Sequence, residues 1–108
     1  MIKIIVFTFT WGTKDLLDRF HDASLDLKLI SITSKIESLE EKLRKTRPKV
    51  FLIDGELPDD LFLDCVDIIE KSISNFDMDT VTCVFEKDKK TPGTIFISEL
   101  SNLNNILT

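Results

Sequence analysis

Short apolar runs alternate with amphipathic segments along the chain, and this alternation is its strongest structural signal. β-branched and aromatic residues crowd into five runs whose length and composition are typical of strands. The runs are residues 2–9, 27–33, 49–53, 80–85 and 94–98. The sequence therefore predicts five strands, and the first of them is apolar enough to be buried on both faces.

Apolar residues recur at helical spacing in the segments that separate the first four strands and at the end of the chain. Helices are predicted over residues 15–23, 34–46, 60–74 and 99–108. In the second helix, Ser34 and Glu37 form an S-x-x-E capping box at its head, and Pro48 ends it. The third helix is apolar on more than one face, so we expect it to lie between the sheet and a neighbour, or against another subunit.

The order of these elements predicts the fold class. Strands separated by helices return in parallel through right-handed crossovers, which gives an α/β fold with helices on both faces of the sheet. We therefore expect residues 1–108 to form one domain, a three-layer sandwich around a mainly parallel five-stranded sheet.

The connection between the last two strands departs from this pattern. It has only eight residues, 86–93, whereas a parallel crossover usually needs a dozen or more and includes a helix. A tight antiparallel return is favoured. The parallel alternative stays open, because eight extended residues reach roughly 26 Å.

Composition and charge exclude several classes of function. The chain of 108 residues has a net charge of -5, which disfavours nucleic acid as a partner because phosphate backbones attract clustered Lys and Arg. No segment predicts a signal peptide or membrane insertion, and the cytoplasm is the expected location. Cys65 and Cys83 lack metal-ligand spacing and are interpreted as buried free thiols.

Asp54 is the main candidate for chemistry. It closes the third predicted strand in "FLIDGELPDD", and ligands of open α/β sheets bind beyond the carboxyl ends of strands. Two interpretations compete: a reactive carboxylate, or a residue that caps the turn before the next helix.

The segment "PKVFLIDGELPDD" resembles the phospho-acceptor segment of bacterial response-regulator receiver domains, with Asp54 at the acceptor position and Pro58 four places on. The resemblance extends over residues 2–74 in element order and spacing. It implies a flavodoxin/CheY-like fold and, in an active member, transfer of a phosphoryl group onto the Asp with the help of Mg²⁺.

This chain departs from the family at the positions that make the chemistry work. The acidic pair that holds Mg²⁺ falls on Thr8 and Phe9, which supply no anionic oxygen, and the lysine after the fifth strand falls on Glu99. The hydroxyl residue of the fourth strand falls near Phe85 or Glu86. The resemblance therefore implies a degenerate receiver-like domain with no catalytic residues, no metal and no cofactor, in which Asp54 is inactive.

Other constellations offer weaker alternatives. Gly12, Thr13 and Lys14 precede a helix but lack the full phosphate-loop pattern, and His21 is the only histidine. Several acids could gather at one edge of the sheet and bind a metal: Asp54, Glu56, Asp59, Asp60, Glu86 and Glu99. The alternative function is thus a small metal-dependent or phosphoryl-accepting domain that uses Asp54 and nearby acids.

The surface gives the better prediction. An apolar last strand at the sheet edge, together with the last helix, could pair with another chain. The candidate interaction surface comprises Ile95, Phe96, Ile97 and Leu103. We expect a non-catalytic module that binds a protein partner or localises one in a bacterial regulatory or assembly system, and a homodimer is one form that this interaction could take.

Overall fold

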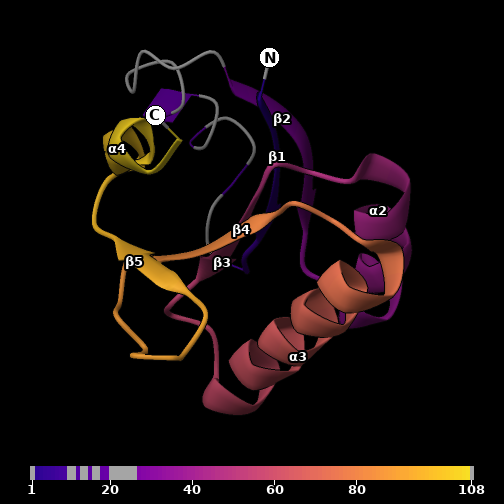
Figure 1. Cartoon of the computed structure of the whole chain (residues 1–108). Coiled ribbons are helices and arrows are strands. Elements are labelled where there is room, and N and C mark those ends of the chain that lie inside the picture. Colours follow the sequence, from indigo (N-terminus) through magenta and orange to yellow (C-terminus); the bar gives the residue numbers. More distant parts are fainter. Residues whose placement is uncertain (1, 10–11, 13–14, 16–17, 20–26, 108) are drawn as a thin grey trace.

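The computed structural model describes residues 2–9, 12, 15, 18–19 and 27–107. Five strands form one sheet in the order β2-β1-β3-β4-β5, and every neighbouring pair is parallel (Figure 1). The strands are β1 (Ile2–Phe7), β2 (Leu27–Thr33), β3 (Val50–Asp54), β4 (Val81–Phe85) and β5 (Ile95–Ile97). The predicted α/β class and five-stranded sheet are confirmed.

Helices cover both faces of the sheet and make three layers (Figure 1). One face carries η1 (Ile36–Ser38), α2 (Leu39–Thr46) and α3 (Asp59–Phe76), and the other carries η2 (Leu100–Asn102) and α4 (Leu103–Leu107). The helix predicted over 15–23 lies largely outside the described residues. None of the helices within the described ranges is long and apolar enough to cross a membrane.

Strand β3 lies in the middle of the sheet, and its sequence does not alternate between apolar and polar residues before Asp54. All five of its residues are buried. Phe51 and Ile53 enter the core under α2 and α3, while Val50 and Leu52 enter the core under α4. A parallel strand covered on both faces needs apolar side chains in both directions.

α3 carries apolar residues on more than one face because it, too, packs against more than one element. Its residues Phe62, Cys65 and Ile69 are buried against the sheet, and Leu61 and Ile68 pack partly buried against the same core. Because α2 lies beside α3, the predicted neighbour is another helix of the same chain. Cys65, like Cys83 in β4, is a buried free thiol, as predicted.

The favoured antiparallel direction of β5 is wrong. β5 runs parallel to β4, with Cys83 opposite Ile95 and Phe85 opposite Ile97. The short connection suffices because β5 has only three residues, about 10 Å of strand, so little distance has to be retraced. Positive φ angles at Glu86 (79°), Lys90 (49°) and Gly93 (83°) turn the chain within the connection.

The predicted capping box at Ser34 is also wrong. The helical segment opens as the 3-10 turn η1, whose N-cap is Lys35, and no side chain caps it. Instead, the hydroxyl of Thr33 accepts the amide of Lys35 at 3.2 Å. The predicted helix end is confirmed, because α2 stops at Thr46 just before Pro48.

Candidate functional site

Asp54 ends β3 at the carboxyl edge of the sheet, where β1 and β4 flank it. Its exposed fraction is 0%. The residue thus occupies the position that the sequence predicted for a ligand site, but solvent does not reach its side chain.

Both carboxylate oxygens of Asp54 accept hydrogen bonds. The hydroxyl of Thr8, itself buried, donates to Oδ2 at 2.7 Å, and the amide of Glu56 donates to Oδ1 at 2.8 Å. The amide of Leu57 donates to the Asp54 carbonyl at 3.2 Å. A hydrogen bond from a backbone amide to the side chain of an Asp two residues earlier, as from Glu56 to Asp54, closes an Asx turn. Asp54 therefore caps the turn after β3.

The connection after β4 lies directly on this turn. We call residues 86–89 the strap. The amide of Gly55 donates to the carbonyl of Phe85 at 2.8 Å. A Cβ atom on Gly55 would lie 2.0 Å from the carbonyl oxygen of Lys87, so only glycine allows the two backbones to come this close.

Lys89 fastens the strap to the start of α3. Its ammonium donates to Oδ1 of Asp59 at 2.6 Å and to the carbonyl of Leu57 at 3.4 Å. It also lies 5.7 Å from the centre of the Phe62 ring, within the range of a cation–π contact. The hydrogen bond from Lys89 and its positive charge lower the pKa of Asp59.

A second ion pair holds the other end of the strap. Nη1 of Arg19 lies 3.3 Å from Oε1 of Glu86. The strap is therefore tied to a residue before β2 at one end and to α3 at the other. Sequence analysis missed the role of Lys89, because nothing in the pattern around a lysine in a polar loop indicates which distant carboxylate it meets.

A hollow of about 430 Å³ lies between the strap and the first turns of α3. Its walls mix apolar and charged side chains: Asp59, Phe62, Leu63, Lys87, Asp88, Lys89 and Thr91. Within it, Lys89 and Asp59 bind each other, so these two charges are already paired.

The acids of the alternative metal site do not assemble. Among the residues that the structure describes, no three His, Cys, Asp or Glu side chains form a group that could hold a metal ion. Asp59 binds Lys89 and Glu86 binds Arg19. Glu99 caps η2, where it accepts the hydroxyl of Ser101 at 3.2 Å.

Two other candidates of the sequence stay untested. Thr13 and Lys14, which follow Gly12, and the single histidine His21 lie outside the described residues.

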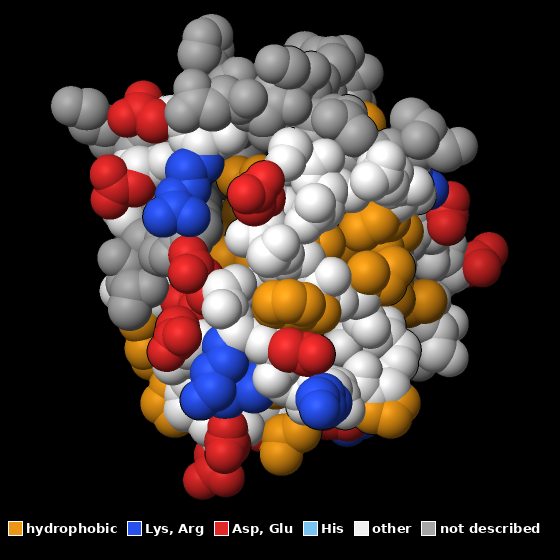
Figure 2. Space-filling view, turned by 90° about the vertical axis from the view of Figure 1, so that its left-hand side faces the viewer, with side chains coloured by type: hydrophobic (Ala, Val, Ile, Leu, Met, Phe, Trp, Pro, Cys, Tyr) orange, Lys and Arg blue, Asp and Glu red, His pale blue; other side chains and the backbone are white. Residues whose placement is uncertain are grey.

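The predicted interaction surface is only partly exposed. Ile95 and Phe96 are exposed by 43% and 42%, whereas Ile97 and Leu103 are buried at 2% and 0%. Ile97 lies opposite Phe85 and joins the core under α4, to which Leu103 also belongs, so these two residues are corrected to core. The β5 surface, defined here as Ile95 and Phe96, remains. Figure 2 views the molecule from the side of β5 and α4, and hydrophobic side chains gather there among charged ones.

Phe96 is exposed because no helix connects β4 to β5. It lies opposite Val84, which is buried in the core under α2 and α3. Its side chain therefore points to the same face of the sheet as α3. A helix in the connection would cover this face of the edge strand, and the nine-residue loop 86–94 covers only part of it.

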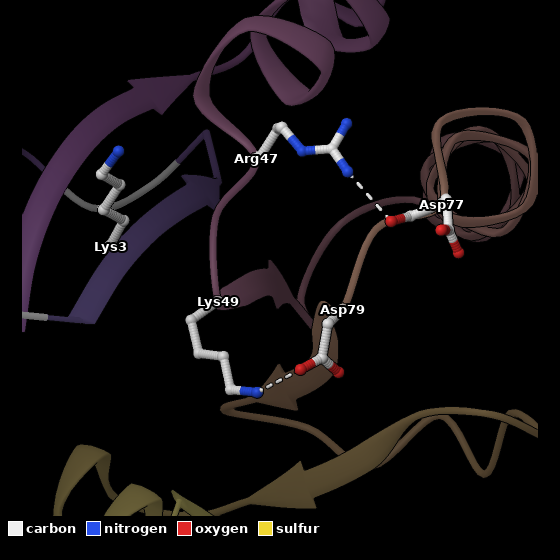
Figure 3. Close-up of a pocket in the computed structure, with 5 residues that line it drawn as sticks. All are labelled: Lys3, Arg47, Lys49, Asp77 and Asp79. Atoms are coloured by element: carbon white, nitrogen blue, oxygen red, sulfur yellow. Dashed lines mark hydrogen bonds and ion pairs between the residues drawn. The ribbon is translucent and has the colours of Figure 1, made fainter.

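A second hollow, of about 400 Å³, lies at the amino-terminal ends of the strands, away from Asp54 (Figure 3). Lys3, Arg47, Lys49, Asp77 and Asp79 line it. Figure 3 shows Arg47 reaching the carbonyl of Asp77, at 2.9 Å, and Lys49 reaching Asp79, also at 2.9 Å.

Arg47, one of the cations of this second hollow, has a structural role. Arg47 and Asp77 are the C-caps of α2 and α3, and both have left-handed backbones. Cations stabilise the negative ends of helix dipoles, and Arg47 satisfies a carbonyl at the end of α3. We interpret the hollow as the joint between two helix ends.

Comparison with known proteins supports the fold alone. No protein-family model matches the sequence, and no curated protein matches it. The chain is similar to the structure of the signal receiver domain of NarL, a protein of Mycobacterium tuberculosis described as a response regulator. The TM-score is 0.65 at 11% identity, over 98% of this chain and 93% of that one.

A second structural likeness is more distant. The luciferase-like enzyme of the nonluminescent mealworm Zophobas morio matches with a TM-score of 0.52 at 17% identity, over 87% of this chain but only 20% of the enzyme. The parallel five-stranded sheet and the likeness to the NarL receiver domain together show that the chain has the flavodoxin/CheY-like fold.

Proposed function

We propose that this chain is a receiver-like module that accepts no phosphoryl group and acts by binding a protein partner in a bacterial regulatory or assembly system. The observation that carries the first half is the state of Asp54. Its side chain is completely buried and hydrogen-bonded at both oxygens, so an incoming phosphodonor has no path to either oxygen.

The surroundings of Asp54 support the same conclusion. Mg²⁺ needs oxygen ligands in near-octahedral geometry. Thr8 stands where receiver domains carry an acid, and its hydroxyl is directed at Asp54. Phe9, at the other acidic position, is an exposed aromatic residue. Without Mg²⁺, a phosphoryl group on Asp54 would lack the divalent counter-charge that an active receiver domain supplies.

Phosphoryl acceptance is tested by incubating the protein with Mg²⁺ and acetyl phosphate and measuring its intact mass. We expect no phosphate-sized gain in the wild type or in Asp54→Asn. A gain in the wild type that disappears in Asp54→Asn would contradict the proposal and favour the alternative of a phosphoryl-accepting domain.

The β5 surface supports the second half. Ile95 and Phe96 are neighbours in an edge strand, so they project to opposite faces of the sheet, and both are more than two-fifths exposed. Exposed apolar residues beside an unpaired strand edge are a common protein-binding feature. We propose that partners, including a second copy of the chain, bind there.

Sedimentation equilibrium over a range of concentrations tests the homodimer. If the β5 surface self-associates, the wild type gains mass with concentration, and Ile95→Ser/Phe96→Ser stays monomeric. Leu63→Ser is the control, because Leu63 is an apolar residue even more exposed, at 56%, but belongs to α3. A wild type that is monomeric at all concentrations would remove the homodimer and leave a different protein as the partner.

A further inference from the structure

The strap closes the carboxyl edge of the sheet with the chain's own backbone. Open α/β sheets bind their ligands at this edge. Glu86 is tied to Arg19, and Lys89 to Asp59, while the backbone of Lys87 rests on Gly55 between these two ties. The closure lies immediately beyond Asp54.

Lys89 makes the shorter of the strap's two ion pairs, at 2.6 Å to Asp59 against 3.3 Å between Arg19 and Glu86. Its side chain is only 14% exposed, while that of its partner Asp59 is 83% exposed; those of Arg19 and Glu86 are exposed by 55% and 32%. Hydrogen bonds that involve a charged donor are short and about twice as strong as neutral ones, and they are less screened when the donor is shielded from water.

The strap is built so that it could open without unfolding the sheet. The residues Glu86, Lys87 and Asp88 are exposed and polar, so moving them would uncover little apolar surface of their own. Glu86 and Lys90, at the two ends, have positive φ angles of 79° and 49°. Left-handed backbones at non-glycine residues are mildly strained, and they place the turning points of the chain on either side of the strap.

We propose that the strap is a latch that Lys89 holds shut, and that releasing Lys89 from Asp59 opens the turn around Asp54 to solvent and to small reagents. This inference rests on the proposed function, because it describes how access to that silent site is controlled. Partner binding or a mutation that draws Lys89 away would act as the release.

Carboxyl labelling measures this access directly. The folded protein is treated with a water-soluble carbodiimide and glycinamide, and the modification of Asp54 is quantified by peptide mass spectrometry relative to Asp79, whose side chain is 95% exposed. In Lys89→Met, which keeps the apolar stem over Phe62, we expect labelling of Asp54 to rise roughly tenfold, the change in a local opening equilibrium when one charge-assisted hydrogen bond is lost.

Two matched controls separate the latch from general effects. Lys90→Met removes the neighbouring lysine, whose backbone amide, not its ammonium, makes the hydrogen bond to Asp88. Asp59→Asn releases Lys89 from the other side, and Asp60→Asn removes an equal charge from the same first turn of α3. We expect higher labelling in Lys89→Met and Asp59→Asn, and wild-type labelling in the two controls.

The proposal is overturned if both latch variants keep their circular dichroism spectrum and wild-type labelling, or if all four variants label alike. Should Lys89→Met fail to fold, Asp59→Asn decides alone. This experiment uses no phosphodonor, so its failure leaves the proposed function standing. Conversely, a phosphate gain on the wild-type protein would overturn the proposed function without touching the labelling result.

Discussion

The hydroxyl of Thr8 donates a 2.7 Å hydrogen bond to the carboxylate of Asp54, and the two residues are 46 positions apart. The bond joins the ends of β1 and β3, which are neighbours in the sheet. A receiver domain would hold a metal-binding acid here, which repels the acceptor carboxylate until a cation arrives. Here a hydroxyl donates to that carboxylate directly, and a charge-assisted hydrogen bond of this kind stabilises the ionised form.

Removal of the Thr8 hydroxyl should therefore destabilise the fold. We expect Thr8→Val, which keeps the shape of the side chain, to lower the free energy of unfolding by about 2 kcal/mol, because a buried carboxylate loses a hydrogen-bond donor. Urea denaturation of Thr8→Val, Asp54→Asn and the double variant measures the coupling. A coupling energy below about 0.5 kcal/mol would show that the bond contributes little.

Gly55 should tolerate no side chain. Gly55→Ala would place a Cβ atom 2.0 Å from the Lys87 carbonyl oxygen, so the strap must move, and we expect a loss of about 1–3 kcal/mol in unfolding free energy. Gly12→Ala is the control, since the atom of the described residues that its Cβ would meet is a carboxylate oxygen of Asp15, at an ordinary 3.9 Å. Equal denaturation midpoints for the two variants would refute the close approach.

Ser72 should be better replaced by alanine. Its hydroxyl, on the buried side of α3, has no hydrogen-bond partner within the described part of the chain. Ser72→Ala and Ser74→Ala both gain helix propensity, but only the first removes a buried polar group, because Ser74 is exposed. We expect Ser72→Ala to be more stable than Ser74→Ala by about 1 kcal/mol in thermal or urea unfolding. The opposite order would mean that the hydroxyl is satisfied in solution.

The buried thiols predict a loss of stability in alkali. Burial raises the pKa of Cys65 and of Cys83 from 9.0 to about 12. Above pH 9 the unfolded thiols release protons that the folded thiols keep, so the unfolding free energy falls as the pH rises toward 12, by up to about 1.4 kcal/mol per thiol and pH unit. Below pH 9 this contribution is fully present.

The measurement is the difference in unfolding free energy between the wild type and Cys65→Ala/Cys83→Val on either side of pH 9. The two proteins differ only at these two side chains, so the pH dependence of the difference isolates the thiols. Parallel pH profiles would rule out the effect. In the folded wild type we also expect both thiols to resist a thiol reagent until denaturant is added.

The position of the candidate site could be predicted from the sequence, but the burial of Asp54 could not. The end of an apolar strand placed Asp54 at the carboxyl edge of the sheet, and the Asp-x-x-x-Pro spacing identified the turn. The hydroxyl of Thr8 reaches Asp54, and the backbone of Lys87 reaches the next residue, Gly55, from other parts of the chain. The exposure of Ile95 and the burial of Ile97, two residues apart, likewise depend on what packs against each of them.

By itself, the sequence determined the order and nature of the described strands and helices, because apolar periodicity and the fixed φ of proline act over a few residues. Only the tertiary structure decided the direction of β5, the closure of the strap and the partner of Lys89. The direction of β5 depends on its pairing with β4, where Cys83 lies opposite Ile95. The strap and Lys89 depend on contacts between segments about thirty residues apart, such as Lys89 with Asp59, which are 30 positions apart. Contacts of this kind arise only after the sheet has brought the strand ends together, so no local pattern encodes them.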